Sequence, residues 1–167
     1  MEKLIKSLCK NVRPEKNFTK DAVFLMSDYI QRFIESLISN KTHISLFSIK
    51  ERMESIVHPF QIPYIEKDID SSFYKYYKNG PSNNPSINYV KKWLKYQSVD
   101  TFCYTDLLYI STCVDYLCLE LCELSGKIAN ENKKTRVTSD HIYDAIANDE
   151  ALSFTFRFSK SRKFSRK

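Results

Sequence analysis

Glycine is nearly absent from this chain of 167 residues, which contains two, Gly80 and Gly126. A β-sheet protein of this size normally needs several tight turns, and tight turns favour glycine, so this scarcity argues against an all-β architecture. Leu, Ile, Tyr and Phe recur instead in long periodic runs. The sequence therefore predicts an all-α protein with few, long helices.

Long apolar runs are also missing. No segment reaches the roughly 18 consecutive apolar residues that a membrane-spanning helix requires. The opening segment MEKLIKSLCK is interrupted by lysine, which is not typical of a signal peptide. We therefore expect neither a membrane partner nor export.

The chain lacks the residue patterns of metal centres and catalytic sites. Its five cysteines form no CxxC pair and its three histidines lie elsewhere, so we expect no metal and no cofactor. We interpret the cysteines as small buried thiols in a reducing compartment. Ser139, Asp140 and His141 are adjacent, and adjacent side chains cannot form a catalytic triad. We predict no catalytic residues and a protein that is not an enzyme.

Basic residues are concentrated at one end of the sequence. Residues 157–167, RFSKSRKFSRK, hold six of the 26 Lys and Arg residues and no acid, which leaves 20 basic against 20 acidic residues elsewhere. Residues 81–156 alone have 7 basic and 10 acidic residues. We interpret the tail as a flexible arm for polyanions, and we expect other polyanion contacts to depend on local patches.

Hydrophobic periodicity divides the chain into two similar halves. The pattern in the first half predicts helices over 4–12, 23–37 and 49–57, a loop over 39–48, and an amphipathic helix after Pro63. The segment KNGPSNNPSIN is the clearest linker. In the second half, a short helix over 87–96 precedes a long one over 107–128, whose apolar seam needs a long partner helix. An ordinary helical bundle is the alternative to two interlocked units.

A basic turn precedes the last expected helix. Thr138 is a good N-cap and Asp140 suits the positive end of a helix dipole, so a helix is expected to begin near Thr138. Lys133, Lys134 and Arg136 lie directly before it, where their side chains and free backbone amides would meet a phosphate. Taken alone, such a turn is also typical of a solvated loop.

This region resembles one family of core histones. Asn132 to Arg136, with Tyr116-Leu117, Glu120, Glu123-Leu124 and Gly126 upstream, is similar to the second helix and following loop of the histone known as two-A. Ala145-Ile146 and Asn148-Asp149-Glu150 resemble the end of its third helix and the acidic turn after it. The resemblance implies a histone fold in the second half of the chain.

The first half is similar to the partner histone known as two-B. Val12-Arg13-Pro14-Glu15 resembles the turn after its first helix, and Lys20, Ala22 and Met26 fall near the start of its long helix, although the next loop is shorter. The whole chain then resembles the fused histone doublets of giant DNA viruses, with two histone folds in an intramolecular handshake. This implies a two-B-like fold with an extra helix over 1–78, a linker over 79–88, a two-A-like fold over 89–156 and a basic tail over 157–167.

The resemblance implies a way of holding double-stranded DNA. In the histone octamer, arginines enter the minor groove and helix ends hold adjacent phosphates without reading bases. Arg136 matches a minor-groove arginine. The residues expected at phosphates are Lys133, Lys134 and Thr135, then Lys16, Thr19 and Lys20 in the neighbouring loop of the first fold, Lys41 at the opposite pair of loops, and Lys91, Lys92 and Lys95 on the short helix. The site at Lys41 is expected to be poor because Asp100 and Thr101 replace a basic residue, and three lysines on a short helix are also typical of a solvated face.

The second half also carries acidic residues at positions that match the acidic patch of the two-A family: Asp115, Glu120, Glu123, Asp149 and Glu150. The first three span roughly 140° of one helix, opposite its apolar seam. The resemblance implies that this surface takes arginine anchors or basic tails of other proteins. We expect a reduced patch because Ala151 replaces a further acid, and a solvated helix face is the alternative.

Together these features indicate a core-histone-like doublet that assembles with three/four-type histones, or a fused doublet of them, to wrap and compact DNA. The DNA would be a viral genome in a virion and in a viral factory or host nucleus, or otherwise nuclear chromatin. Since SFTFRFSKSRKFSRK replaces the family's docking segment, we expect loose particles. The shortened loops and missing tails lead to the hypothesis of a variant role beside a longer doublet. The alternative is a histone-fold transcription or assembly adaptor that binds protein without wrapping DNA.

Overall fold

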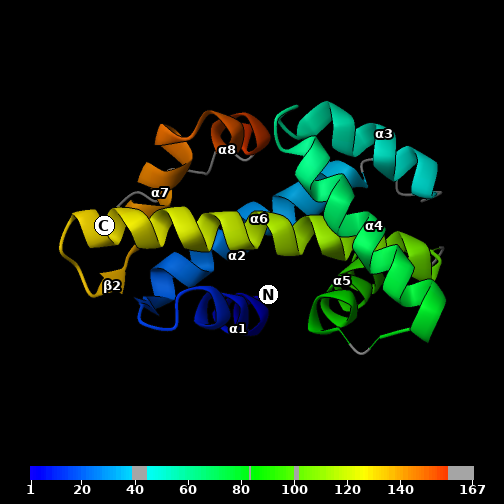
Figure 1. Cartoon of the computed structure of the whole chain (residues 1–167), viewed down its shortest axis with the longest axis horizontal. Coiled ribbons are helices and arrows are strands. Elements are labelled where there is room, and N and C mark those ends of the chain that lie inside the picture. The colour runs from blue at the N-terminus through cyan, green and yellow to red at the C-terminus, as the bar shows by residue number, and fades with distance from the viewer. Residues whose placement is uncertain (39–44, 83, 100–101, 158–167) are drawn as a thin grey trace.

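The computed structural model describes residues 1–38, 45–82, 84–99 and 102–157 (Figure 1). Within them it contains eight helices and two short strands. In chain order these are α1 (Glu2–Val12), β1 (Asn17–Phe18), α2 (Lys20–Leu37), α3 (Leu46–Ile56), α4 (Ile62–Asn79), α5 (Pro85–Tyr96), α6 (Tyr104–Glu131), β2 (Arg136–Val137), α7 (Ser139–Asn148) and α8 (Glu150–Thr155). The prediction of an all-α histone fold is confirmed. None of the helices in these ranges combines the length and apolarity needed to cross a membrane.

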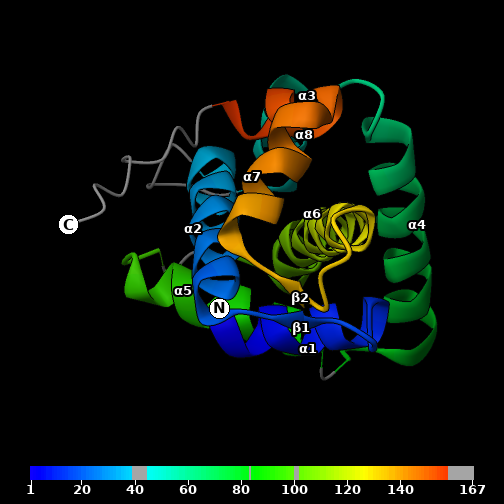
Figure 2. The same ribbon diagram turned by 90° about the vertical axis from the view of Figure 1, so that its left-hand side faces the viewer.

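Two units of the same plan interlock in this fold. Helices α1, α2 and α3 form the first, helices α5, α6 and α7 form the second, and the middle helix is the longest in each. Figure 1 shows α6 running the length of the molecule with α2 crossing behind it. In Figure 2, which looks along α6, helices α1, α2, α4 and α7 lie around it.

Helix α6 is buried well beyond the single apolar seam that its sequence shows. Helices α1 to α5 and α7 all pack against it, so every residue from Asp106 to Val114 is buried. Ser111 and Thr112 are accommodated because their hydroxyls donate to the carbonyl of Leu108 one turn earlier. Helix α6 is therefore the common core element of both units.

Local sequence sets the helix boundaries. Helices α2 and α6 each begin three residues earlier than the apolar pattern predicted, at Lys20 and Tyr104, and α3 and the segment after Asp149 also differ from our expectation. Helix α3 begins at Leu46 instead of residue 49, because Ser45 and Ser48 cap each other across its first turn. The segment after Asp149 forms helix α8 instead of a turn, because the Asp149 carboxylate accepts from the backbone N–H of Leu152 at 2.8 Å. Residues 39–44 of the expected loop lie outside the described residues.

The cysteines differ from the expected buried thiols in two ways, because one pair forms a disulfide and Cys103 is exposed. Cys9 of α1 and Cys122 of α6 form a disulfide, with their Cα atoms 5.5 Å apart, whereas Cys103, Cys113 and Cys118 are free. The pairing could not be found from sequence spacing, because the two residues are 113 positions apart and meet only when α1 packs on α6. The crosslink joins the first unit to the second.

Reduction is expected to lower the free energy of unfolding. A crosslink that closes a loop of this length restricts the unfolded chain by roughly 4 to 5 kcal/mol in the chain-entropy model, which is an upper figure. Urea titrations with and without dithiothreitol should differ for the wild type and coincide for the Cys9→Ser/Cys122→Ser variant. Alkylation of the unfolded, unreduced chain should modify three cysteines, and modification of all five would contradict the assignment.

Candidate nucleic-acid interface

The two short strands bring the loop before α2 beside the loop before α7. Strands β1 and β2 pair in parallel, with Asn17 opposite Arg136 and Phe18 opposite Val137. The backbone N–H of Thr19 donates to the Val137 carbonyl at 2.9 Å, which extends the pairing by one residue. The structure thus brings together the two loops in which residues 16–20 and 133–136 were expected to meet.

Most of the side chains at this pair of loops face solvent. Val137 is fully buried and anchors β2, whereas Lys133, Lys134, Thr135 and Arg136 are exposed. The backbone of Lys133 is in the left-handed region at φ 54°, so the chain reverses sharply as it leaves α6. The four exposed residues therefore project from one tight turn.

Lys16 and Thr19 have structural partners as well as a place in this site. The Lys16 ammonium donates to the Lys134 carbonyl at 2.7 Å, so it ties the two loops together. The Thr19 hydroxyl accepts from the backbone N–H of Ala22 at 3.3 Å and caps α2, which leaves its own proton free to donate. Lys20 is exposed in the first turn of α2.

Two helix N-termini converge at the paired strands. One cap residue separates each strand from the following helix, Thr19 between β1 and α2 and Thr138 between β2 and α7. In α7, the backbone N–H of Thr138 donates to His141 Nδ1 at 3.0 Å, so the imidazole completes a capping box that the sequence did not suggest. The positive ends of two helix dipoles and the exposed cations thus share one surface, which favours an anion.

A second group of lysines lies along the same edge of the molecule. A groove of about 720 Å³ between α1 and α5 is lined by Lys3 and Lys92, among other residues, while Lys91 and Lys95 are exposed on α5. Figure 1 shows α1, α5 and β2 along the lower edge. We call the paired strands together with the exposed lysines of α1 and α5 the basic edge.

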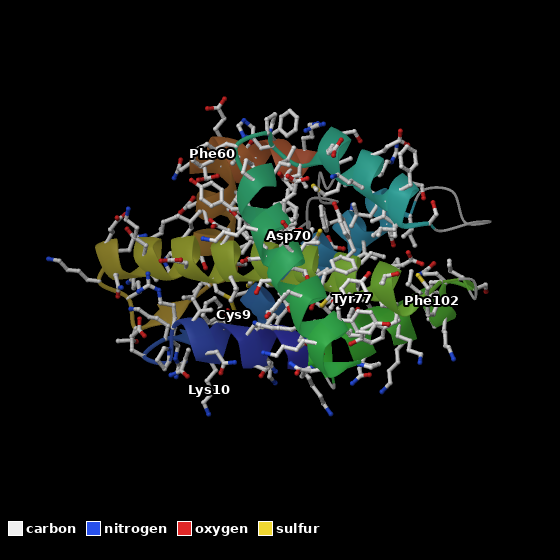
Figure 3. The ribbon with its side chains drawn as sticks, turned by 45° about the vertical axis from the view of Figure 1, so that its right-hand side comes forward. Cys9, Lys10, Phe60, Asp70, Tyr77 and Phe102 are labelled. Carbon is white, nitrogen blue, oxygen red and sulfur yellow. A yellow bond between two sulfur atoms is a disulfide. The ribbon has the colours of Figure 1, made fainter. Side chains whose placement is uncertain are left out.

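Sequence reasoning missed the contribution of α1 to the basic edge. Lys3, Lys6 and Lys10 are exposed, and Lys10 points away from the body of the protein in Figure 3. Their spacing of three and four residues, opposite the buried Leu4 and Ile5, was the available signal. Lys41, Asp100 and Thr101, which were expected at the opposite pair of loops, lie outside the described residues.

Three of the expected acidic residues lie close together. Burial raises the pKa of the Glu120 carboxyl, and the nearby carboxylates of Glu123 and Asp149 raise it further, against a hydrogen bond with Tyr116. Glu150 is exposed in the first turn of α8, directly after Asp149. We call Glu120, Glu123, Asp149 and Glu150 the acidic cluster.

Helix α4 adds an acid to this surface that sequence reasoning did not include. Burial raises the pKa of the Tyr116 phenol, and the carboxylates of Glu120 and Asp68 raise it further, so Asp68 lies beside the acidic cluster. Tyr64, one turn before Asp68, is 51% exposed and belongs to the same neighbourhood. Only the packing of α4 across α6 brings these residues to the second unit.

Asp115 is not gathered into the acidic cluster. Its carboxylate accepts a hydrogen bond from the Ser86 hydroxyl at the start of α5, and it also bonds with Asn84, which caps that helix. Burial raises the pKa of Asp115, and these two hydrogen bonds act in the opposite direction. Asp115 therefore holds the start of α5 against α6.

Comparison with known proteins finds a partial similarity to histones. No protein-family model matches the chain. It is 46% identical over 46 residues to a histone of the two-A type from Plasmodium falciparum, and equally to two probable histones of the same type from Arabidopsis thaliana. Each match covers 28% of this chain and 35% of the relative, so the chain spans about a third of the length of the curated relatives it matches. This partial similarity agrees with the histone fold.

The buried Asp115 should give the protein a measurable pH dependence. Its pKa is raised above the ordinary 3.8. Between pH 3.8 and the raised pKa, the folded state therefore keeps a proton that the unfolded state releases. The free energy of unfolding should therefore fall as pH rises through that window. Asp115→Asn should remove this component and Ser86→Ala should steepen it, as measured by urea unfolding from about pH 4 to pH 7. Parallel pH profiles for the wild type and Asp115→Asn would refute the assignment.

Proposed function

We propose that this chain is a core-histone-like doublet that packages double-stranded DNA together with three/four-type histones or a fused doublet of them. The observation that carries the proposal is the exposed Arg136 on a strand pair flanked by two helix N-termini. A DNA minor groove offers a narrow negative channel for an arginine, and the adjacent phosphates suit the helix ends. Binding of this kind reads no base sequence.

The other residues of the basic edge have distinct parts in this proposal. Lys133, Lys134 and Thr135 flank Arg136 and contact phosphates, as do Lys20 and the hydroxyl proton of Thr19. Lys16 contributes mainly by keeping the two loops together, because its ammonium already donates to a carbonyl. The lysines of α1 and α5 extend the contact along the DNA, so that the duplex follows the lower edge in Figure 1.

The charge balance suggests a loosely held duplex. Outside residues 157–167 the chain has as many acidic as basic residues, so few phosphates are neutralised by general positive charge. Each phosphate contact contributes about 0.9 units to the slope of log affinity against log salt, and a short contact set gives a shallow slope and weak binding. Compaction then depends on assembly with the partner histones.

The acidic cluster is the proposed contact for arginine anchors or basic tails of other proteins. Asp68 and the exposed Tyr64 enlarge it, since a tyrosine ring beside carboxylates suits a guanidinium group. Asp115 bonds with Ser86 and does not belong to the acidic cluster, so the cluster is smaller than the acidic patch that the sequence implied.

We further propose that the packaged DNA is viral and that the protein acts in virions, viral factories or the host nucleus, with nuclear chromatin as the alternative setting. Support comes from the two histone-fold units in one chain, which resemble fused viral doublets. The role is structural and non-enzymatic, as a variant beside a longer doublet.

One observation favours an adaptor that binds protein without wrapping DNA. Residues 81–156 hold more acidic than basic residues, as expected for a fold that does not wrap DNA. The exposed loop from Lys133 to Arg136 weighs against it, because an adaptor has no need of an arginine between two helix ends. The following experiment separates the two functions.

Reconstitution with three/four-type histones on DNA of nucleosome length should protect a fragment from micrococcal nuclease. We expect protection at low salt that shortens or vanishes as salt rises, because the contact set is small. A stable protein complex without any protected fragment would favour the adaptor.

Arg136→Ala should weaken DNA binding and reduce the salt slope by about one unit. Arg136→Lys should keep most of the slope and still lose affinity, because an ammonium group is more strongly hydrated in the minor groove. Lys75→Ala on the exposed face of α4 is the matched control. Equal effects of Arg136→Ala and Lys75→Ala, measured by fluorescence anisotropy across a salt series, would argue against a specific role for the loop.

A further inference from the structure

A small polar cleft lies on the opposite side of α4 from the acidic cluster. It has a volume of about 240 Å³ and is lined by Lys50 of α3, Glu66, Ile69 and Asp70 of α4, and Tyr109 of α6. Figure 3 shows Asp70 midway along α4, where that helix passes over α6. The cleft therefore lies at the junction of three helices.

Tyr109 is the unusual member of this cleft. The residue is only 4% exposed, and its hydroxyl is buried without a hydrogen-bond partner among the described residues. Burial raises the pKa of the phenol, with further contributions from Cys113, Glu66 and Glu54, so the hydroxyl stays protonated and lies near the two carboxylates. Buried polar groups almost always have a partner, so a ligand that enters the cleft would meet a hydroxyl whose hydrogen-bonding capacity is unused among the described residues.

Negative charge predominates around the cleft. The Lys50 ammonium lies 3.3 Å from Glu66 Oε1 and 3.9 Å from Glu54 Oε1, so one cation is shared between two carboxylates. Asp70 adds a third carboxylate and is exposed. This excess of negative charge selects for a positively charged ligand.

The cleft and the acidic cluster are separate sites. Glu66 and Asp70 are one turn apart and share a face of α4, whereas Asp68 lies roughly 200° around the helix from each of them. Asp68 accordingly raises the pKa of the Tyr116 phenol, and Glu66 raises the pKa of the Tyr109 phenol. A partner at one face does not occupy the other.

We propose that this cleft takes the guanidinium group of one arginine side chain from a protein partner. A guanidinium has a fixed fork of five N–H donors, which suits the Asp70 and Glu66 carboxylates and the lone pairs of the Tyr109 hydroxyl at the same time. The volume suits one side chain and excludes a folded segment. Among the described residues, no group of three His, Cys, Asp or Glu side chains could hold a metal ion, which argues against a metal as the cation.

Lys50 acts as a competitor at this site. Its ion pair with Glu66 joins two side chains that are 52% and 41% exposed, and exposed pairs of this kind are weak. An incoming arginine can therefore move Lys50 aside and reach the phenol beneath it. Removing the Lys50 charge should strengthen binding.

The test uses the full chain labelled with ¹³Cζ-tyrosine, with the Tyr109 signal assigned from Tyr109→Phe. N-acetyl-arginine amide should shift the Tyr109 signal in a saturable way, and the neutral analogue N-acetyl-citrulline amide should not. Asp70→Asn should weaken binding about tenfold, because a charge-assisted hydrogen bond is lost. Lys50→Met should strengthen it. Asp68→Asn and Lys75→Met, which lie roughly 140° to 180° around α4 from Glu66 and Asp70, are the matched controls and should leave the affinity measured at Tyr109 unchanged.

Thermal unfolding distinguishes a loss of binding from a folding defect in each variant. Tyr109→Phe removes an unpaired hydroxyl, so it should unfold at the same temperature as the wild type or higher. Because this variant lacks the Tyr109 signal, its expected loss of affinity for the arginine probe is measured by calorimetric titration against the wild type. Equal shifts with the arginine and citrulline probes, no shift at all, or equal losses for Asp68→Asn and Asp70→Asn would each overturn the proposal. None of these outcomes bears on DNA packaging, which the nuclease experiment tests separately.

Discussion

The burial of α6 by helices from both halves of the chain is the constraint on which the rest of the structure depends. A helix of 28 residues cannot be covered by its own short neighbours, so α1, α2, α3 and α4 must supply the remaining cover. Neither half is then a complete folding unit, since each leaves apolar surface that only the other buries. The interlocked arrangement follows from that shared core element, and the surface sites follow from the arrangement.

Each surface site is assembled from segments that are distant in sequence. The paired strands join residues 17–18 to residues 136–137, and the acidic surface joins Asp68 of α4 to Glu120 of α6. The cleft at Tyr109 needs α3, α4 and α6 together. Docking of α4 across α6 thus separates two acidic surfaces, because successive acids of α4 point to different sides.

The sequence predicted the elements better than the contacts between them. Periodicity located the helices, the N-cap at Thr138 located the start of α7 because it acts locally, and the resemblance placed Arg136 beside the first loop. Sequence reasoning could not foresee that Cys9 meets Cys122 or that Asp115 bonds with Ser86, because both contacts depend on how α1 and α5 dock on α6. Asp115 shows the limit of a family match: its position agreed with the acidic patch, while its surroundings give the carboxylate a buried partner. The Ser45 and Ser48 caps were readable in sequence and shifted the start of α3 by one turn.

The linker between α4 and α5 has a consequence for how the two halves find each other. It runs from Gly80 to Asn84, and the Tyr104 hydroxyl accepts from the backbone N–H of Ser82 at 2.8 Å, which keeps this short connection close to α6. Two such units on separate chains would pair in a bimolecular step and dissociate on dilution. In this chain a linker of a few residues keeps the two units at a high effective concentration. Their pairing is therefore unimolecular, and the ratio of the two units is always one to one. Such a protein stays assembled at copy numbers at which two separate chains would come apart.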